Sequence, residues 1–147
     1  MTTTGTSASS PIETARSFFR VANQIRFAVT LSGAAERPIP VTMTGSGNGI
    51  LYLDGNKLTL DLAYSGLSAV ATGAHIHAPA SVEEIAGVVV DLQPLHQGAF
   101  GAAGKFVGAV NLTPSLVTAI LNGMAYVNIH TSNHPAGEIR GQIPRTP

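Results

Sequence analysis

The sequence predicts an all-β protein, an antiparallel Greek-key-like β-sandwich or barrel with one short helix near the N-terminus and one short internal helix. Most of the chain consists of short segments in which apolar and polar residues alternate, as in strands that bury one face. Gly, Pro, Asn or Ser bound these segments, which is typical of turns. The 147 residues suit one compact domain, since domains most often have roughly 100–150 residues. We therefore expect a tail and helix over residues 1–23 and one β-domain over residues 24–147.

The N-terminal segment predicts a disordered tail followed by a helix. Residues 1–9 are rich in Thr and Ser, a composition too polar to offset the entropy lost on ordering. Ser10 can then cap a helix, Pro11 suits the first helical position, and Glu13 completes a capping box. These signals predict a helix over about residues 11–23. Two phenylalanines in this segment make it a candidate contact in a homo-oligomer.

Eight strands are predicted after this segment. In the first, Phe27, Val29 and Leu31 alternate with residues expected to face solvent. Between the second and third, Asp54-Gly55 supplies the positive φ angles that a tight hairpin needs. The predicted strands cover about residues 24–31, 50–53, 58–64, 72–78, 87–92, 105–112, 125–131 and 137–143.

One short helix interrupts the later strands. Thr113 can cap it, Pro114 opens it, and Asn122-Gly123 ends it. Earlier in the chain, the glycine-rich residues 45–49 lack both the lysine of a phosphate loop and the helical pattern of a dinucleotide site. We therefore expect them to form a turn before a strand.

The composition argues against several classes of function. Charged residues make up 11% of the chain and the formal net charge is zero, which argues against a nucleic-acid surface. The chain has no cysteine, which removes disulfides, thiolate zinc sites and cysteine nucleophiles. It has no run of roughly 18 apolar residues that could span a bilayer. Because it also lacks the basic start and apolar stretch of a secretory signal, we expect a cytoplasmic protein, or a periplasmic or secreted one if a signal has been removed.

Histidine is the unusual component of this weakly charged chain. Four of the five histidines form two short clusters, and two of them lie two residues apart in one predicted strand. Residues at this spacing point to the same face, so His75 and His77 project together. His130 shares a face with Tyr126 and Asn128 in the strand over residues 125–131. If the two strands are neighbours, the three histidines form a metal site, and all-imidazole ligation favours copper or zinc.

Further polar residues are candidates for the same site. His134 lies in a turn sequence and is a candidate fourth ligand. Glu138 and Arg140 are candidate catalytic groups, although such a pair more often braces loops. The residues expected to surround the ligands are Tyr126, Asn128 and Gln142. A metal-free hydrogen-bonded cluster and a plainly solvated polar face explain the same residue types.

Four motifs together resemble the CHRD domain, a module first recognised in chordin and common in bacterial proteins. They are LSGAAERP at residues 31–38, GAHIHAPA at 73–80, YVNIHT at 126–131 and GEIRGQI at 137–143. The resemblance covers about residues 25–143 and implies no particular reaction, because the family shares none. The His-x-His strand is also similar, more distantly, to that of copper-zinc superoxide dismutase, a β-sandwich. This chain lacks the cysteines and the zinc-loop ligands of that family.

Three functions remain open on this basis. The first is a metal-binding β-sandwich that acts as a small metalloenzyme on a small-molecule substrate. The second is a non-enzymatic interaction module with a protein partner, in which the polar cluster only stabilises the fold. The third is an enzyme of a biosynthetic pathway that uses the same polar face as a pocket. Neither a nucleic acid nor a membrane is expected as a partner.

Overall fold

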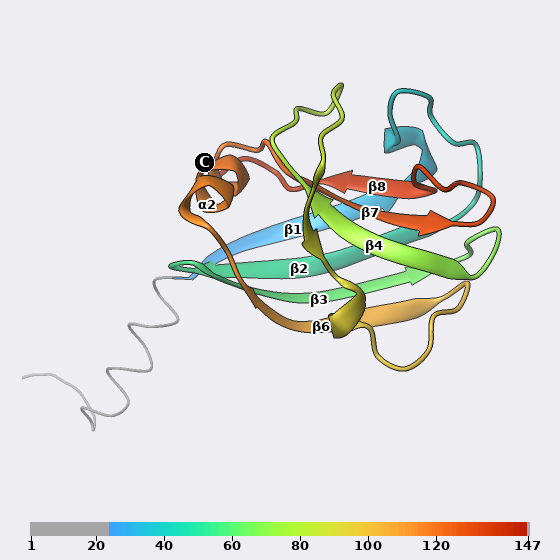
Figure 1. The fold of residues 1–147 in the computed structure, drawn as a ribbon, viewed down its shortest axis with the longest axis horizontal. Coiled ribbons are helices and arrows are strands. Elements are labelled where there is room, and N and C mark those ends of the chain that lie inside the picture. Colours follow the sequence, from blue (N-terminus) through green and yellow to red (C-terminus); the bar gives the residue numbers. More distant parts are fainter. Residues whose placement is uncertain (1–23, 147) are drawn as a thin grey trace, which may run out of the picture.

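The computed structural model describes residues 24–146, which form a mostly β fold (Figure 1). Eight antiparallel strands make one sheet, with one short α-helix and two 3₁₀ turns between them. The strands are β1 (Ile25–Ser32), β2 (Ser46–Asp54), β3 (Lys57–Ser65), β4 (Ala71–His77), β5 (Val88–Asp91), β6 (Gly104–Asn111), β7 (Tyr126–Thr131) and β8 (Ile139–Gln142). The α-helix is α2 (Pro114–Leu121). The 3₁₀ turns are η1 (Gly33–Ala35) and η2 (Gln93–Leu95).

The sheet has the order β5-β4-β7-β8-β1-β2-β3-β6 and curls into a half-barrel. The pairing between β1 and β8 consists of Ser32 opposite Arg140, whereas β1 pairs with β2 along its whole length. In Figure 1, β4, β7 and β8 lie over the layer made by β1, β2, β3 and β6 and run at an angle to it. The segment that follows β5 and η2 contacts β6 at the other end of the sheet. There Gln97 donates its backbone N–H to Lys105 O at 2.9 Å.

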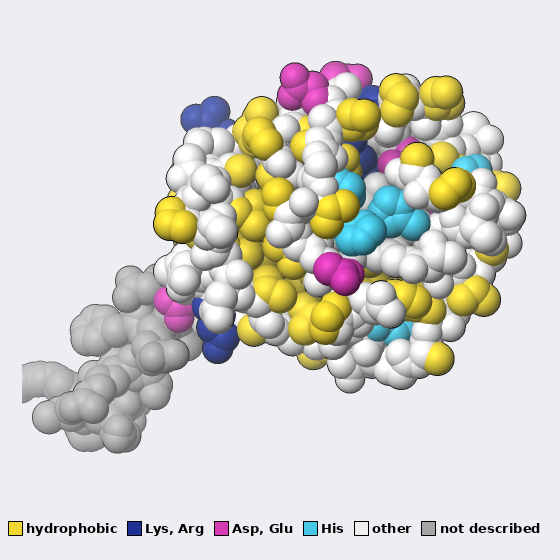
Figure 2. Space-filling model, in the orientation of Figure 1, with side chains coloured by type: hydrophobic (Ala, Val, Ile, Leu, Met, Phe, Trp, Pro, Cys, Tyr) yellow, Lys and Arg dark blue, Asp and Glu magenta, His cyan; other side chains and the backbone are white. Residues whose placement is uncertain are grey.

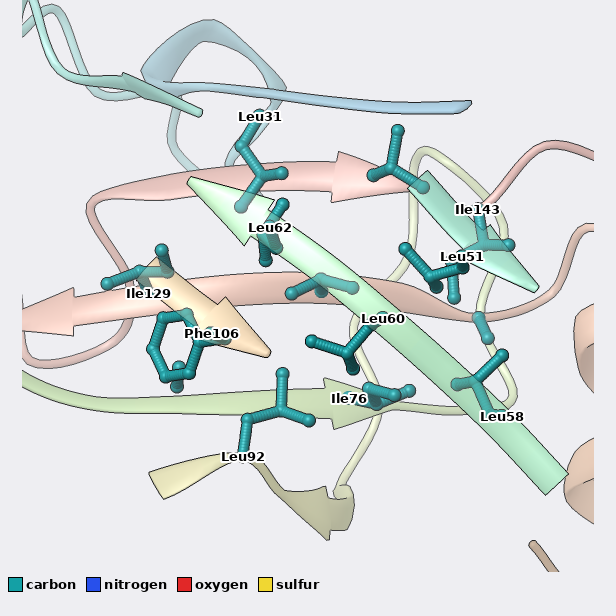
Figure 3. Close-up of a cluster of buried hydrophobic side chains, with 14 of the residues drawn as sticks. Leu31, Leu51, Leu58, Leu60, Leu62, Ile76, Leu92, Phe106, Ile129 and Ile143 are labelled. Atoms are coloured by element: carbon teal, nitrogen blue, oxygen red, sulfur yellow. The ribbon is translucent and has the colours of Figure 1, made fainter. Parts of the chain in front are cut away.

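The hydrophobic core lies between the two parts of the curled sheet (Figure 3). Leu60 and Leu62 of β3 face Ile76 of β4 and Ile129 of β7, and all four are at most 2% exposed. Phe106 of β6 fills the space toward the edge near β5 and is fully buried. Because alternate residues of a strand point to opposite faces, a core-facing Ile76 turns both His75 and His77 outward.

The all-β prediction and the eight expected strands are confirmed, with shifts of a few residues at their ends. The internal helix is also confirmed: Thr113 caps α2, and its Oγ1 accepts a hydrogen bond from the backbone N–H of Leu116 at 3.3 Å. The strands form one curled sheet, which is a simpler arrangement than two stacked sheets. The predicted N-terminal helix lies outside the described residues. No helix among residues 24–146 is long and apolar enough to cross a membrane.

The prediction of a turn at residues 45–49 is wrong. Four of these residues belong to β2, where Gly47 and Gly49 pair with β3. A Cβ at Gly49 would collide with the backbone oxygen of Asp61 on the neighbouring strand. The glycines are thus explained by close strand packing rather than by a change of chain direction.

Candidate metal centre

Strand pairing brings three predicted ligands together. β4 lies beside β7, with His75 opposite Asn128 and His77 opposite Tyr126. Gly73 of β4 is opposite His130, which places this histidine diagonally beside His75. Each of the three histidines offers one ring nitrogen, and these nitrogens all lie within 4.8 Å of one another. Figure 2 shows histidine side chains gathered at the surface of the face on view.

Two of the histidines form a direct pair. His130 Nδ1 lies 2.9 Å from Pro135 O, and since a carbonyl oxygen can only accept, Nδ1 carries the proton. The lone pair of His130 Nε2 then faces His75 Nδ1 at 3.0 Å. Two imidazole nitrogens on a tetrahedral zinc ion with Zn–N near 2.0–2.1 Å are about 3.3 Å apart. The 3.0 Å separation is close to this distance, and an ion there would replace the proton that His75 Nδ1 donates to His130 Nε2.

His77 is held in a similar way by backbone and amide groups. Its Nδ1 lies 2.8 Å from Ala86 O, and its Nε2 lies 2.9 Å from Asn128 Oδ1. The ring stacks on Tyr126, with centroids 4.7 Å apart and planes inclined by 5°. Because Nδ1 donates to the carbonyl, Nε2 is the atom left for a metal. It faces the Asn128 amide oxygen, which is also an acceptor, so a metal at Nε2 would have to displace both this contact and the proton that it requires. Metal-bound histidines commonly donate their other N–H to a carbonyl in this manner.

The surroundings of His75 and His130 favour neutral imidazoles. Burial lowers the pKa of His75, and the charge of His77 adds to this effect, although Asp91 opposes it. Burial likewise lowers the pKa of His130, against the hydrogen bond to Pro135. A lowered pKa leaves both rings neutral near pH 7, which is the protonation state that binds a metal.

Arg140 lies behind the histidines rather than among them. Its guanidinium carbon is 3.5 Å from the ring centroid of Tyr126. Its N–H groups donate to Glu84 O at 2.8 Å, to Ser81 O at 2.9 Å and to Gln142 Oε1 at 3.1 Å. The side chain is 1% exposed. Arg140 thus fixes the segment between β4 and β5 and supports the Tyr126 ring on which His77 stacks.

Gln142 extends this support along β8. Its Nε2 donates to Ala80 O at 2.7 Å and to Gly123 O at 2.8 Å. Among the residues expected to surround the ligands, Asn128 and Tyr126 therefore contact a histidine of the group directly, whereas Gln142 contacts backbone behind it.

Glu138 lies at the end of the sheet, away from the three histidines. Its carboxylate accepts hydrogen bonds from Ser68 N at 2.7 Å, from Ser68 Oγ at 2.6 Å and from Thr131 Oγ1 at 2.8 Å. Burial opposes ionisation, but the hydrogen bonds from Ser68 and Thr131 outweigh it, so the pKa of this carboxyl is lowered. This arrangement ties the loop after β3 to β7, a structural use of the carboxylate.

The remaining two histidines lie elsewhere. His134 is not part of the three-histidine group, and its Nε2 is buried without a hydrogen-bond partner among residues 24–146. His96 packs beside the aromatic rings of Phe100 and Phe106, and its Nε2 lies 2.9 Å from the Tyr64 hydroxyl.

Glu36 was missed by the sequence-based reasoning. It is 3% exposed, and burial raises the pKa of its carboxyl to about 7, against the positive charge of Arg140 and the amide of Asn128. It follows η1 in an irregular segment, where strand periodicity carries no information about burial. Its position within the first CHRD motif, at residues 31–38, was the one available signal.

The sequence that forms these strands matches a known protein family. The CHRD domain model matches residues 27–143, a range that contains all three histidines of the group. The chain therefore belongs to the CHRD domain family. Neither a curated protein nor a solved structure gives a significant match to this chain.

Proposed function

We propose that this CHRD domain binds one divalent metal ion, zinc or copper, through His75, His77 and His130. The observation that carries the proposal is the convergence of three imidazoles from two neighbouring strands, with their nitrogens within 4.8 Å of one another. Two of the rings donate Nδ1–H to a backbone carbonyl, which leaves Nε2 as the nitrogen that would bind an ion. All-imidazole ligation suits zinc and copper.

Three protein ligands would leave a coordination position for water or a substrate atom. An ion in such a site lowers the pKa of bound water or polarises a carbonyl oxygen. The Tyr126 ring, on which His77 stacks, and the Ala86 carbonyl, which accepts from Nδ1, would orient the His77 ligand from outside the coordination sphere. This chemistry is that of a small metalloenzyme, which is the function that the site would support.

A second candidate is a metal-free structural cluster within an interaction module. One observation favours it: the hydrogen bonds among His75, His130, His77 and Asn128 already partner most of the ring nitrogens. In that case the histidines stabilise the pairing of β4 with β7. The two functions differ in whether a metal adds stability.

Zinc and copper titration of protein purified without a histidine tag tests the proposal. A ligand that binds only the folded state at 100 times its dissociation constant raises the free energy of unfolding by about 2.7 kcal/mol. We expect stabilisation of this order, measured by thermal or urea unfolding. We also expect His75→Ala and His130→Ala to abolish it.

His96→Gln serves as the matched control, because His96 lies near β6 and outside the group. It should leave the metal-dependent stabilisation unchanged. The metal site is rejected if neither metal stabilises the protein. If His75→Ala and His130→Ala also lower the stability of the metal-free protein, the histidines form a structural cluster instead.

A further inference from the structure

A cavity of about 500 Å³ lies beside the three-histidine group. It is formed by residues 36–42, which follow η1, and by residues 133–137, which join β7 to β8 (Figure 1). Proline, isoleucine, valine and alanine side chains make up much of its wall. Small-molecule sites are typically apolar clefts of about 300–1,000 Å³ with a few polar groups. The size and lining of this cavity fall within that description.

Two buried polar atoms in this wall lack partners. Among residues 24–146, Glu36 Oε2 and His134 Nε2 are the two buried side-chain atoms without a hydrogen bond. Both residues line the same cavity. Unpaired buried polar atoms are costly and uncommon in folded proteins, so two of them in residues that line one cavity point to a missing hydrogen-bonding group.

The neighbouring cations do not supply that group. The Arg140 guanidinium donates to Ser81, Glu84 and Gln142. Arg37 lines the cavity, but it donates to Glu83 and to the backbone oxygens of Ala34 and Glu36. The Glu36 carboxyl therefore lies near positive charge without accepting a hydrogen bond from either guanidinium. The Asn128 amide also lies beside this carboxyl and lowers its pKa, but Oε2 is left without a hydrogen bond.

Glycine at position 137 allows the carboxyl to reach this place. A Cβ there would collide with Glu36 Oε2, and Gly137 has a φ of 126°, which disfavours other residues. The Gly137 backbone thus approaches the unpaired oxygen closely, and both residues line the cavity. Glycine is also the usual residue where the backbone must approach a ligand closely.

We propose that this cavity binds a small molecule with an apolar body and an amino or hydroxyl group. The donor group hydrogen-bonds Glu36 Oε2, His134 Nε2 contacts the same polar end, and the apolar body lies against residues 38–41. This site goes beyond the metal site and needs no metal. The two are nonetheless adjacent, because Pro135 lines the cavity and its carbonyl accepts from His130 Nδ1.

Nuclear magnetic resonance of the metal-free protein, labelled with ¹⁵N, tests the proposal with benzylamine, benzyl alcohol and toluene. We expect benzylamine, benzyl alcohol or both to shift the amide signals of residues 36–42 and 133–137 saturably. Toluene has no donor and should bind roughly tenfold more weakly, the factor expected for one hydrogen bond to a charged group. The stronger of the two donor probes distinguishes an ammonium from a hydroxyl ligand.

Three variants complete the experiment. Glu36→Gln should weaken the binding of benzylamine by roughly tenfold, because it removes a charge-assisted hydrogen bond. Asp61→Asn, at an exposed carboxylate of β3, is the control and should bind as the unaltered protein does. Thr42→Trp places a large ring at the exposed edge of the cavity and should abolish binding without disturbing the core.

The proposal is overturned if neither donor probe shifts these residues saturably, or if Thr42→Trp binds the probes unchanged. Equal binding of toluene and both donors would also overturn it, since the unpaired atoms would then play no part. The metal titration is a separate measurement, so a negative result in the NMR experiment does not contradict the metal site. A negative metal titration likewise does not contradict the ligand cavity.

Discussion

Arg140→Ala is expected to lower the free energy of unfolding by about 3 kcal/mol or more. The substitution removes a buried charge whose N–H groups satisfy the carbonyl oxygens of Ser81 and Glu84. It also removes the cation–π contact with Tyr126 and leaves a large void, since Arg140 is among the largest fully buried side chains. Urea unfolding measures the loss.

The same substitution should weaken metal binding indirectly. The segment that Arg140 holds also contains Ala86, whose carbonyl accepts from His77 Nδ1. Arg26→Ala, at an exposed position of β1, is the control and should change stability by less than about 0.5 kcal/mol. A loss of under about 1 kcal/mol for Arg140→Ala would contradict the structural role assigned to this side chain.

Glu36→Gln is expected to change how stability depends on pH. The carboxyl has a pKa of about 7 in the folded protein and 4.5 as its ordinary value. Between these values the folded state binds more protons than the unfolded state, so Glu36 makes stability fall as the pH rises. At 1.36 kcal/mol per pKa unit, the fall amounts to about 3 kcal/mol and is complete above pH 7.

The glutamine variant lacks this dependence, because its side chain does not titrate. The free energy of unfolding of the variant, relative to that of the unaltered protein, should therefore rise by about 3 kcal/mol between pH 4.5 and a pH above 7. Urea unfolding of both proteins across this range isolates the contribution, since the other titrating groups are shared. A difference that stays constant with pH would show that Glu36 is not buried as described.

The strands were predictable because their signal is local. In β3, Leu58, Leu60 and Leu62 alternate with residues that face outward, and the period of two appears directly in the sequence. The joining of β8 to β1, which links the two parts of the sheet, was not predictable in the same way. It depends on the contact of Ser32 with Arg140, which joins residues far apart in the chain.

The three-histidine group was predictable in part. Strand parity places His75 and His77 on one face, but their approach to His130 requires β4 to pair with β7, which parity alone does not determine. Glu138 shows the limit of the same reasoning. β8 begins at Ile139, so Glu138 precedes the strand, and its side chain reaches Ser68 and Thr131 instead of the histidines.

X-ray absorption at the metal edge gives the strictest test of the three-histidine metal site. Protein without a histidine tag is loaded with one equivalent of zinc, and the ligands of the bound ion are determined from the spectrum. We expect three imidazole nitrogens at about 2.0 Å, one each from His75, His77 and His130, and fewer in His75→Ala. A spectrum with two imidazoles or fewer, or one that His75→Ala leaves unchanged, would contradict it.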